Sequence, residues 1–128
     1  MGFTRSFKFL DDDLNRRLIG LLKSAGVKHA VDKAGVVSYS PTDEEVVEND
    51  LICSIRDQVF SSWQILTCPN GWIARYKRYM NEHGIPFSEE LSNKEVWFLI
   101  PRKHRPHSWK LEDHVPTKQA RRSLTRRS

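Results

Sequence analysis

The sequence predicts an α+β protein with a ferredoxin-like antiparallel sheet and its helices on one face, followed by a basic C-terminal tail. Two observations lead to this class. Short apolar runs typical of strands alternate with segments of helical spacing, in the order β-α-β-β-α-β followed by α-β. Residues 102–128, in contrast, have no apolar periodicity and are rich in Lys and Arg. We therefore expect one α+β globular domain over residues 1–101 and an extended or disordered tail over residues 102–128.

A strand over residues 3–10 and a helix after it begin the predicted order. Aromatic residues give the strand its bulk, and Asp11-Asp12-Asp13 provide an N-cap and negative charge for the first helical turn. Apolar residues then recur at the spacing of one helix face: Leu14, Leu18, Leu21, Leu22 and Ala25. Gly26 lies where a left-handed C-terminal cap ends such a helix.

The next segment predicts a hairpin and a second helix. Residues 27–31 and 36–39 form the arms of the hairpin, and Asp32-Lys33-Ala34-Gly35 forms its tip. Pro41-Thr42-Asp43-Glu44-Glu45 is typical of a helix start, and apolar residues follow every four positions. The sequence therefore predicts a single helix over about residues 42–60.

Three further elements complete the predicted domain. Residues 63–68 form a strand, and Pro69-Asn70-Gly71 forms a turn by composition. From Gly71 the pattern is helical until Gly84, and Pro86 prevents its continuation. Residues 95–100 are the most hydrophobic run of the chain and are too short for a helix, so they predict a central strand.

The charge of the chain is distributed unevenly. Its 128 residues have a net charge of +5, which is compatible with one compact domain and a basic segment. Residues 1–101 hold 12 Lys and Arg against 14 Asp and Glu, whereas residues 102–128 hold nine against two. A mildly acidic body with a basic extremity is typical of proteins that bind polyanions.

The composition also bears on the compartment. Two cysteines, Cys53 and Cys68, are too few for a disulfide framework, and we interpret them as buried, reduced thiols. The N-terminal residues lack the apolar stretch of a secretory signal, and no run approaches the ~20 apolar residues of a membrane span. We therefore expect a cytoplasmic protein with no membrane partner.

The basic tail is the main candidate site. Lys and Arg neutralise phosphates and release counterions, and an aromatic side chain stacks on an unpaired base. The residues that we expect to bind nucleic acid are Arg102, Lys103, Arg105, Trp109, Lys110, Arg121, Arg122, Arg126 and Arg127. Other interpretations of the tail are a solvated segment that keeps the protein soluble, or a segment that docks on an acidic protein.

The helix predicted after Gly71 adds secondary candidates. Arg75 and Arg78 are three residues apart and share a helix face, with Lys77 at its margin. They lie among Trp72, Tyr76 and Tyr79, so the alternative is a helix with an aromatic core face and an ordinary charged solvent face. None of the predicted strands carries the Lys/Arg-Gly-aromatic run of an RNA recognition motif.

Metal binding and catalysis have less support. His104, His107 and His114, with Glu112 and Asp113, contain the ligand types of a zinc site but lack the cysteines usual in structural sites, so we expect no metal and no cofactor. Cys68 precedes a turn and a helix start, where backbone N–H groups stabilise a thiolate. This is the one enzymatic alternative, since no nucleophile or phosphate-loop motif is present.

The sequence thus favours a small non-enzymatic module that binds RNA or DNA backbone through a basic C-terminal arm. The alternative is a protein interaction module or regulatory subunit that self-associates as a homodimer through an apolar strand, or docks its tail on an acidic partner.

Overall fold

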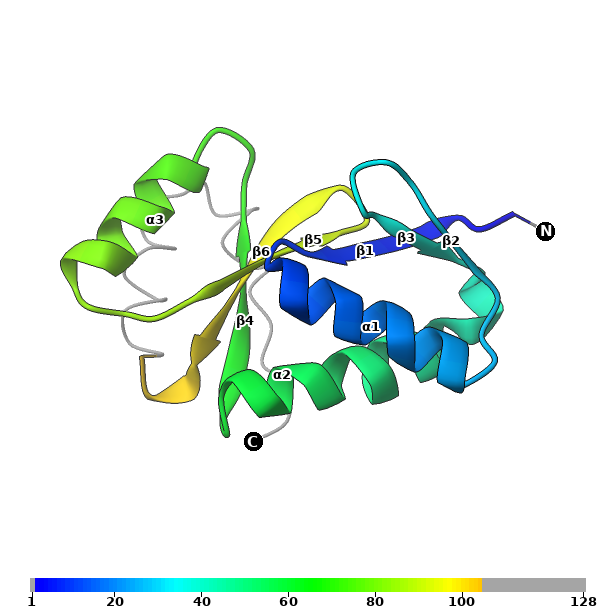
Figure 1. Cartoon of the computed structure of the whole chain (residues 1–128). Helices are drawn as coiled ribbons and strands as arrows, with labels where there is room; N and C mark the ends of the chain where they lie inside the picture. Colours follow the sequence, from blue (N-terminus) through cyan, green and yellow to red (C-terminus); the bar gives the residue numbers. More distant parts are fainter. Residues whose placement is uncertain (1, 105–128) are drawn as a thin grey trace. The chain divides into compact units, whose positions relative to one another are not determined.

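The computed structural model describes residues 2–104, which form six strands and three α-helices (Figure 1). The strands are β1 (Arg5–Phe9), β2 (His29–Val31), β3 (Val37–Tyr39), β4 (Trp63–Cys68), β5 (Ser88–Ser92) and β6 (Glu95–Pro101). The α-helices are α1 (Asp12–Ser24), α2 (Cys53–Val59) and α3 (Ile73–Glu82). Three further helical segments are the 3₁₀ turns η1 (Pro41–Asp43) and η3 (Arg102–His104) and the π-helical η2 (Glu45–Ile52).

The predicted α+β class is confirmed: the six strands belong to one antiparallel sheet with the order β2-β3-β1-β5-β6-β4. The succession β2-β3-β1 matches a split β-α-β unit, with β3 antiparallel to both neighbours. The exact ferredoxin-like order is not confirmed, because β5 pairs with the other side of β1 (Phe7↔Ser92), where that fold has its fourth strand. The basic tail beyond His104 lies outside the described residues.

By its internal contacts the chain divides into two compact units. Within residues 2–104, unit 1 comprises the chain up to Val59 together with Glu90–Lys94, and unit 2 comprises Phe60–Glu89 together with Glu95–His104.

In unit 1, local signals fix α1 and the hairpin that follows it. The Asp11 side chain accepts a hydrogen bond from the Leu14 N–H at 3.1 Å and so caps α1, as the sequence predicts. At the hairpin tip, the Asp32 carboxylate accepts from the N–H groups of Ala34 and Val36. Gly35 has a φ of +87°, which residues with a side chain rarely adopt, and this conformation closes the turn between β2 and β3.

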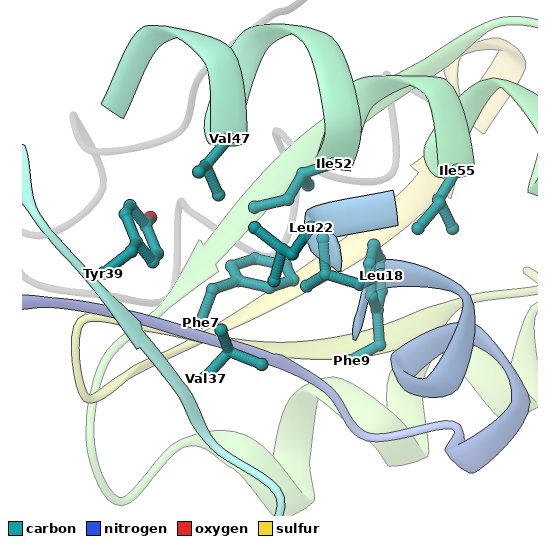
Figure 2. Packing of buried hydrophobic residues seen from close by; sticks show 9 residues of the cluster. All are labelled: Phe7, Phe9, Leu18, Leu22, Val37, Tyr39, Val47, Ile52 and Ile55. Carbon is teal, nitrogen blue, oxygen red and sulfur yellow. The ribbon is translucent and has the colours of Figure 1, made fainter. Parts of the chain in front are cut away.

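The core of unit 1 lies between one face of its strands and its helices. Figure 2 shows side chains from β1, β3, α1, η2 and α2 that point toward one another, and all are almost fully buried. They are Phe7, Phe9, Leu18, Leu22, Val37, Tyr39, Val47, Ile52 and Ile55. Within this unit the helices therefore cover one face of the strands, as the amphipathic patterns predict.

The single helix predicted over residues 42–60 is instead three successive segments, η1, η2 and α2. The side chain of Ser40 caps the first of them, with Oγ accepting from the Thr42 N–H at 3.2 Å. Within η2 the buried residues Val47 and Ile52 are five positions apart, whereas Leu51 is only half-buried. The wider π turn has this spacing, and the prediction of one regular α-helix did not include it.

Unit 2 is built on the antiparallel pair β4 and β6, registered from Trp63↔Pro101 to Cys68↔Val96. All six residues of β4 are buried. The helix α3 packs on this pair through Tyr76 and Met80, whose neighbours in the core include Leu66 and Phe98. The rings of Tyr76 and Phe98 stack with centroids 6.2 Å apart. Among residues 2–104, no helix is both long and apolar enough to cross a membrane.

The strand β5 was not predicted from the sequence. Its residues, Ser88-Glu-Glu-Leu-Ser92, are mostly polar, and only alternate positions are buried. Asn93 and Lys94 then both adopt positive φ, 49° and 71°, and form the two-residue turn that leads into β6. The amide oxygen of Asn93 also accepts from the Ser6 N–H at 2.9 Å, which ties this turn to β1.

Candidate nucleic-acid interface

Four of the eleven residues predicted to bind nucleic acid lie in the described part of the chain. Arg75 and Arg78 belong to α3, whereas Arg102 and Lys103 belong to η3, directly after β6. The others lie outside the described residues: Arg105, Trp109, Lys110, Arg121, Arg122, Arg126 and Arg127.

The core contacts of α3 determine which of its side chains face solvent. The helix begins after a turn in which the Trp72 N–H donates to the Pro69 oxygen at 3.1 Å. Tyr76 and Met80, four residues apart, are 1% and 0% exposed. Arg75 and Arg78 lie on the opposite side of the helix and are exposed, as is Glu82 in the last turn.

Two planar pairs follow one another along α3. The guanidinium carbon of Arg75 lies 4.8 Å from the centroid of the Trp72 ring, which is a cation–π contact. The rings of Tyr79 and His83 are stacked, with centroids 4.0 Å apart and an angle of 21° between their planes. The His83 Nδ1 lies 2.9 Å from the Tyr79 carbonyl oxygen, and this contact fixes the orientation of the ring.

We call Trp72, Arg75, Tyr79 and His83 the α3 row. In each pair the inner ring, Trp72 or Tyr79, is half-buried and packs against the core of unit 2, and the outer group, Arg75 or His83, is exposed. From the sequence, the aromatic residues of this helix were predicted to belong either to the hydrophobic core or to the nucleic-acid interface. Tyr76 is core, whereas Trp72 and Tyr79 lie at its border, where they support an outer planar group.

Lys77, at the margin of the cationic face, has a carboxylate partner. Its Nζ lies 3.0 Å from Glu89 Oε1 of β5, and both residues belong to unit 2. Within residues 2–104, Arg75 and Arg78 form no ion pair. The positive charge that α3 presents to a ligand is therefore that of its two arginines, and the exposed Glu82 opposes it.

The segment η3 lies at the other end of β4 from the start of α3. Arg102 donates its backbone N–H to the Ser62 oxygen at 3.0 Å, next to the Trp63↔Pro101 pair. The turn that leads to α3 follows Cys68 instead, at the opposite end of this strand, which spans about 17 Å at the usual rise per residue. The four described residues among those predicted to bind nucleic acid therefore lie in two groups, Arg75 and Arg78 on α3 and Arg102 and Lys103 in η3.

Unit 1 uses two of its arginines to neutralise carboxylates. Arg56 and Glu90 form a bidentate pair at 3.0 Å (Nε to Oε2) and 2.6 Å (Nη2 to Oε1), and their side chains are 5% and 0% exposed. Burial opposes the charged guanidinium, but the charge and hydrogen bonds of Glu90 outweigh this cost and raise the pKa of Arg56. Its guanidinium also lies 5.8 Å from the centroid of the Phe7 ring.

A second network in unit 1 joins Arg5, Tyr39 and Glu48. Arg5 Nη2 donates to Glu48 Oε2 at 2.7 Å, and the Tyr39 hydroxyl donates to the same oxygen at 2.6 Å. Burial of the Tyr39 hydroxyl, together with this hydrogen bond and the charge of Glu48, raises the pKa of Tyr39. Arg5 also contacts Glu44, at 3.0 Å.

Cys68 is a poor nucleophile in this fold. Its thiol is buried and donates to the Pro69 oxygen, with Sγ 3.6 Å from it. Burial, with a smaller effect of the Glu89 charge, raises the pKa of Cys68 to about 12. The thiol is therefore protonated at neutral pH, and the enzymatic alternative lacks the thiolate that it requires.

Within the described range, no group of three His, Cys, Asp or Glu side chains is placed to hold a metal ion. Of the histidines considered for zinc, only His104 is described, since His107 and His114 lie outside this range with Glu112 and Asp113.

Comparisons with family models, curated proteins and solved structures find no match to this chain. Arg75 and Arg78 were predicted from the sequence, whereas the stacking of His83 on Tyr79 was not. The spacings of the two pairs, three residues for Trp72 and Arg75 and four for Tyr79 and His83, were the available signal.

Proposed function

We propose that this protein binds nucleic acid through its basic C-terminal segment, residues 102–128, with Arg75 and Arg78 of α3 as additional phosphate contacts. The observation that carries the proposal is the distribution of charge, with nine Lys and Arg against two acidic residues in this segment. Each cation that meets a phosphate releases counterions, so such a segment gains affinity from any nucleic acid.

The contrast between two carboxylate-bound arginines of unit 1 and the two exposed arginines of α3 supports this interpretation. In unit 1, Arg5 and Arg56 are held by carboxylates and are partly or fully buried. Arg75 and Arg78 are exposed on α3, and Arg102 and Lys103 continue from β6 into the basic segment. An exposed arginine donates bidentate hydrogen bonds to phosphate, whereas a buried and paired one is unavailable.

The test compares two variants of the full chain that lose the same charge in different places. In the first, Arg121, Arg122, Arg126 and Arg127 are changed to Gln. In the matched control, the exposed lysines Lys23, Lys28, Lys33 and Lys94 of unit 1 are changed to Gln. The affinity for a mixed-sequence single strand is measured against salt concentration by fluorescence anisotropy.

We expect the arginine variant to flatten the log–log salt dependence by about 3, because each phosphate contact on a single strand contributes about 0.7 to the slope. The lysine control should retain the wild-type slope. If both variants flatten it equally, attraction depends on net charge alone and the assignment to the C-terminal segment is wrong. A wild-type affinity no tighter than millimolar at low salt would overturn the function itself.

A further inference from the structure

We propose that the α3 row is a stacking site for unpaired bases, so that the nucleic acid bound is single-stranded. This inference rests on the proposed function and specifies the part of the ligand that α3 recognises. The observation that carries it is the repetition, on one helix, of a half-buried ring that supports an exposed planar group.

The first pair offers the guanidinium plane of Arg75. The guanidinium carbon of Arg75 lies 4.8 Å from the centroid of the Trp72 ring, and the side chain is exposed to solvent. Unpaired bases stack on guanidinium planes as they do on aromatic rings. A base that stacks on the guanidinium adds a second π partner to the existing cation–π contact.

The second pair offers the imidazole ring of His83. Its inner face is stacked on Tyr79 at 4.0 Å, and the contact between Nδ1 and the Tyr79 oxygen holds the ring in this position. Because the orientation is fixed before a ligand arrives, a base that stacks on the exposed side loses little side-chain entropy of the protein.

The spacing of the two platforms suits two different bases. Arg75 and His83 are eight residues apart, which corresponds to about 12 Å along a helix axis. Arg78 lies between them in sequence, is exposed, and carries a positive charge for the connecting phosphates. Glu82, also exposed near the end of α3, reduces this attraction but leaves the two planar faces in place.

A duplex cannot use this site in the same way, because the faces of its bases are covered by their neighbours in the stack. Single strands expose these faces, and stacking on aromatic or guanidinium groups tolerates any base sequence. We therefore expect a preference for unpaired over paired nucleic acid, with little sequence preference.

The experiment separates stacking from charge with two oligonucleotides of equal length and phosphate number, one of thymidines and one abasic. The full chain is compared with Arg75→Lys, which keeps the charge and removes the plane, and with His83→Ala. The matched control is Arg78→Lys, the same chemical change on the same helix at a residue that, within residues 2–104, contacts no ring.

We expect the wild type to bind the thymidine oligonucleotide at least tenfold more tightly than the abasic one, since stacking contributes ~1–3 kcal/mol per base. Arg75→Lys and His83→Ala should each lose roughly fivefold or more on thymidines and nothing on the abasic strand, whereas Arg78→Lys should match the wild type on both. An oligouridine arm, expected to show the same losses, tests whether the site accepts RNA as well as DNA.

Two different failures are distinguishable. If the wild type binds both oligonucleotides equally and the α3 variants change nothing, the stacking site is wrong and the proposed function stands. If the wild type binds neither strand at low salt, the proposed function fails, and the stacking site fails with it. Equal losses for Arg75→Lys and Arg78→Lys would also overturn the stacking site, because the planar pair would then have no special role.

Discussion

In unit 1, Arg5 and Arg56 end against carboxylates, whereas in unit 2 Arg75 and Arg78 end in solvent. The side chains are chemically identical, so their number alone does not reveal a site. What differs is the partner: Glu48 and Glu90 satisfy the guanidinium groups of Arg5 and Arg56, whereas within residues 2–104 Arg75 has only the ring of Trp72. A cation–π contact positions an arginine and leaves its N–H donors available for a ligand.

The comparison implies that Arg5 and Arg56 maintain the fold of unit 1, whereas Arg75 and Arg78 do not maintain that of unit 2. If a substitution at Arg56 left the stability unchanged, or one at Arg78 lowered it strongly, this distinction would be wrong.

Arg56→Met should destabilise the protein by about 3–5 kcal/mol, because it leaves the carboxylate of Glu90 buried without its partner. The free energy of unfolding is measured by urea titration. The double variant Arg56→Met with Glu90→Leu should recover much of the loss, since it removes both charges from the interior. Arg78→Met, the matched change on the exposed face of α3, should stay within about 0.5 kcal/mol of the wild type. A cost below 1 kcal/mol for Arg56→Met would contradict the structural role.

The Cys68 thiol should react slowly with a thiol reagent. With a pKa of about 12 in place of the ordinary 9.0, the thiolate at pH 8 is about a thousand times scarcer than in an unfolded chain. The measurement is the rate of reaction with a disulfide reagent in Cys53→Ala, which leaves Cys68 as the only thiol, with and without denaturant.

The same shift has a thermodynamic consequence with a definite sign. The folded state holds the Cys68 proton more tightly, so its contribution to stability is fully present below pH 9 and declines as the pH rises toward 12. A folded protein whose Cys68 reacts as fast at pH 8 as the unfolded chain would restore the enzymatic alternative.

Glu48→Gln should cost about 1–2 kcal/mol in unfolding experiments. The change weakens two hydrogen bonds to a charged acceptor, from Arg5 and from the Tyr39 hydroxyl, at a site where Glu48 is 29% exposed. Glu45→Gln, an exposed residue of the same η2 segment, provides the control and should change stability by less than about 0.5 kcal/mol. Equal effects of the two substitutions would mean that the network around Arg5 does not stabilise unit 1.

The part of the fold that sequence predicts is the part fixed by neighbours along the chain. The Asp11 cap, the Asp32–Gly35 turn and the apolar spacing of α1 act within a few residues, and the structure contains each of them. The π turn of η2 was not predicted, because the conformation that buries Val47 and Ile52 depends on packing against β1 and β3. The strand β5 was also not predicted, for the same reason, since its polar residues are ordered by pairing with β1.

The same difference between local and distant contacts applies to the candidate site. Trp72 with Arg75, and Tyr79 with His83, are local helical pairs, so their contact is predictable once the helix is accepted. The partner of Arg56, Glu90, lies 34 residues away in β5, and no sequence pattern indicates that pairing. From sequence, Arg56 and Arg78 are equivalent cations on two helices. The fold alone separates them.

Lys77 tests the boundary between the two kinds of cation, with the smallest expected effect. Its ion pair with Glu89 is partly exposed, at 43% and 17%, so Lys77→Gln should cost about 0.5 kcal/mol or less in unfolding experiments. Because Glu89 already neutralises it, the same change should leave the salt dependence of nucleic-acid binding unaltered. Arg75→Gln and Arg78→Gln should each flatten that slope by about 0.7, the contribution of one phosphate contact on a single strand.

If Lys77→Gln flattens the slope as much as Arg78→Gln does, the ion pair between Lys77 and Glu89 opens to bind phosphate. A carboxylate partner at the surface would then not exclude a cation from the site, and the distinction would hold only for buried pairs such as Arg56 and Glu90.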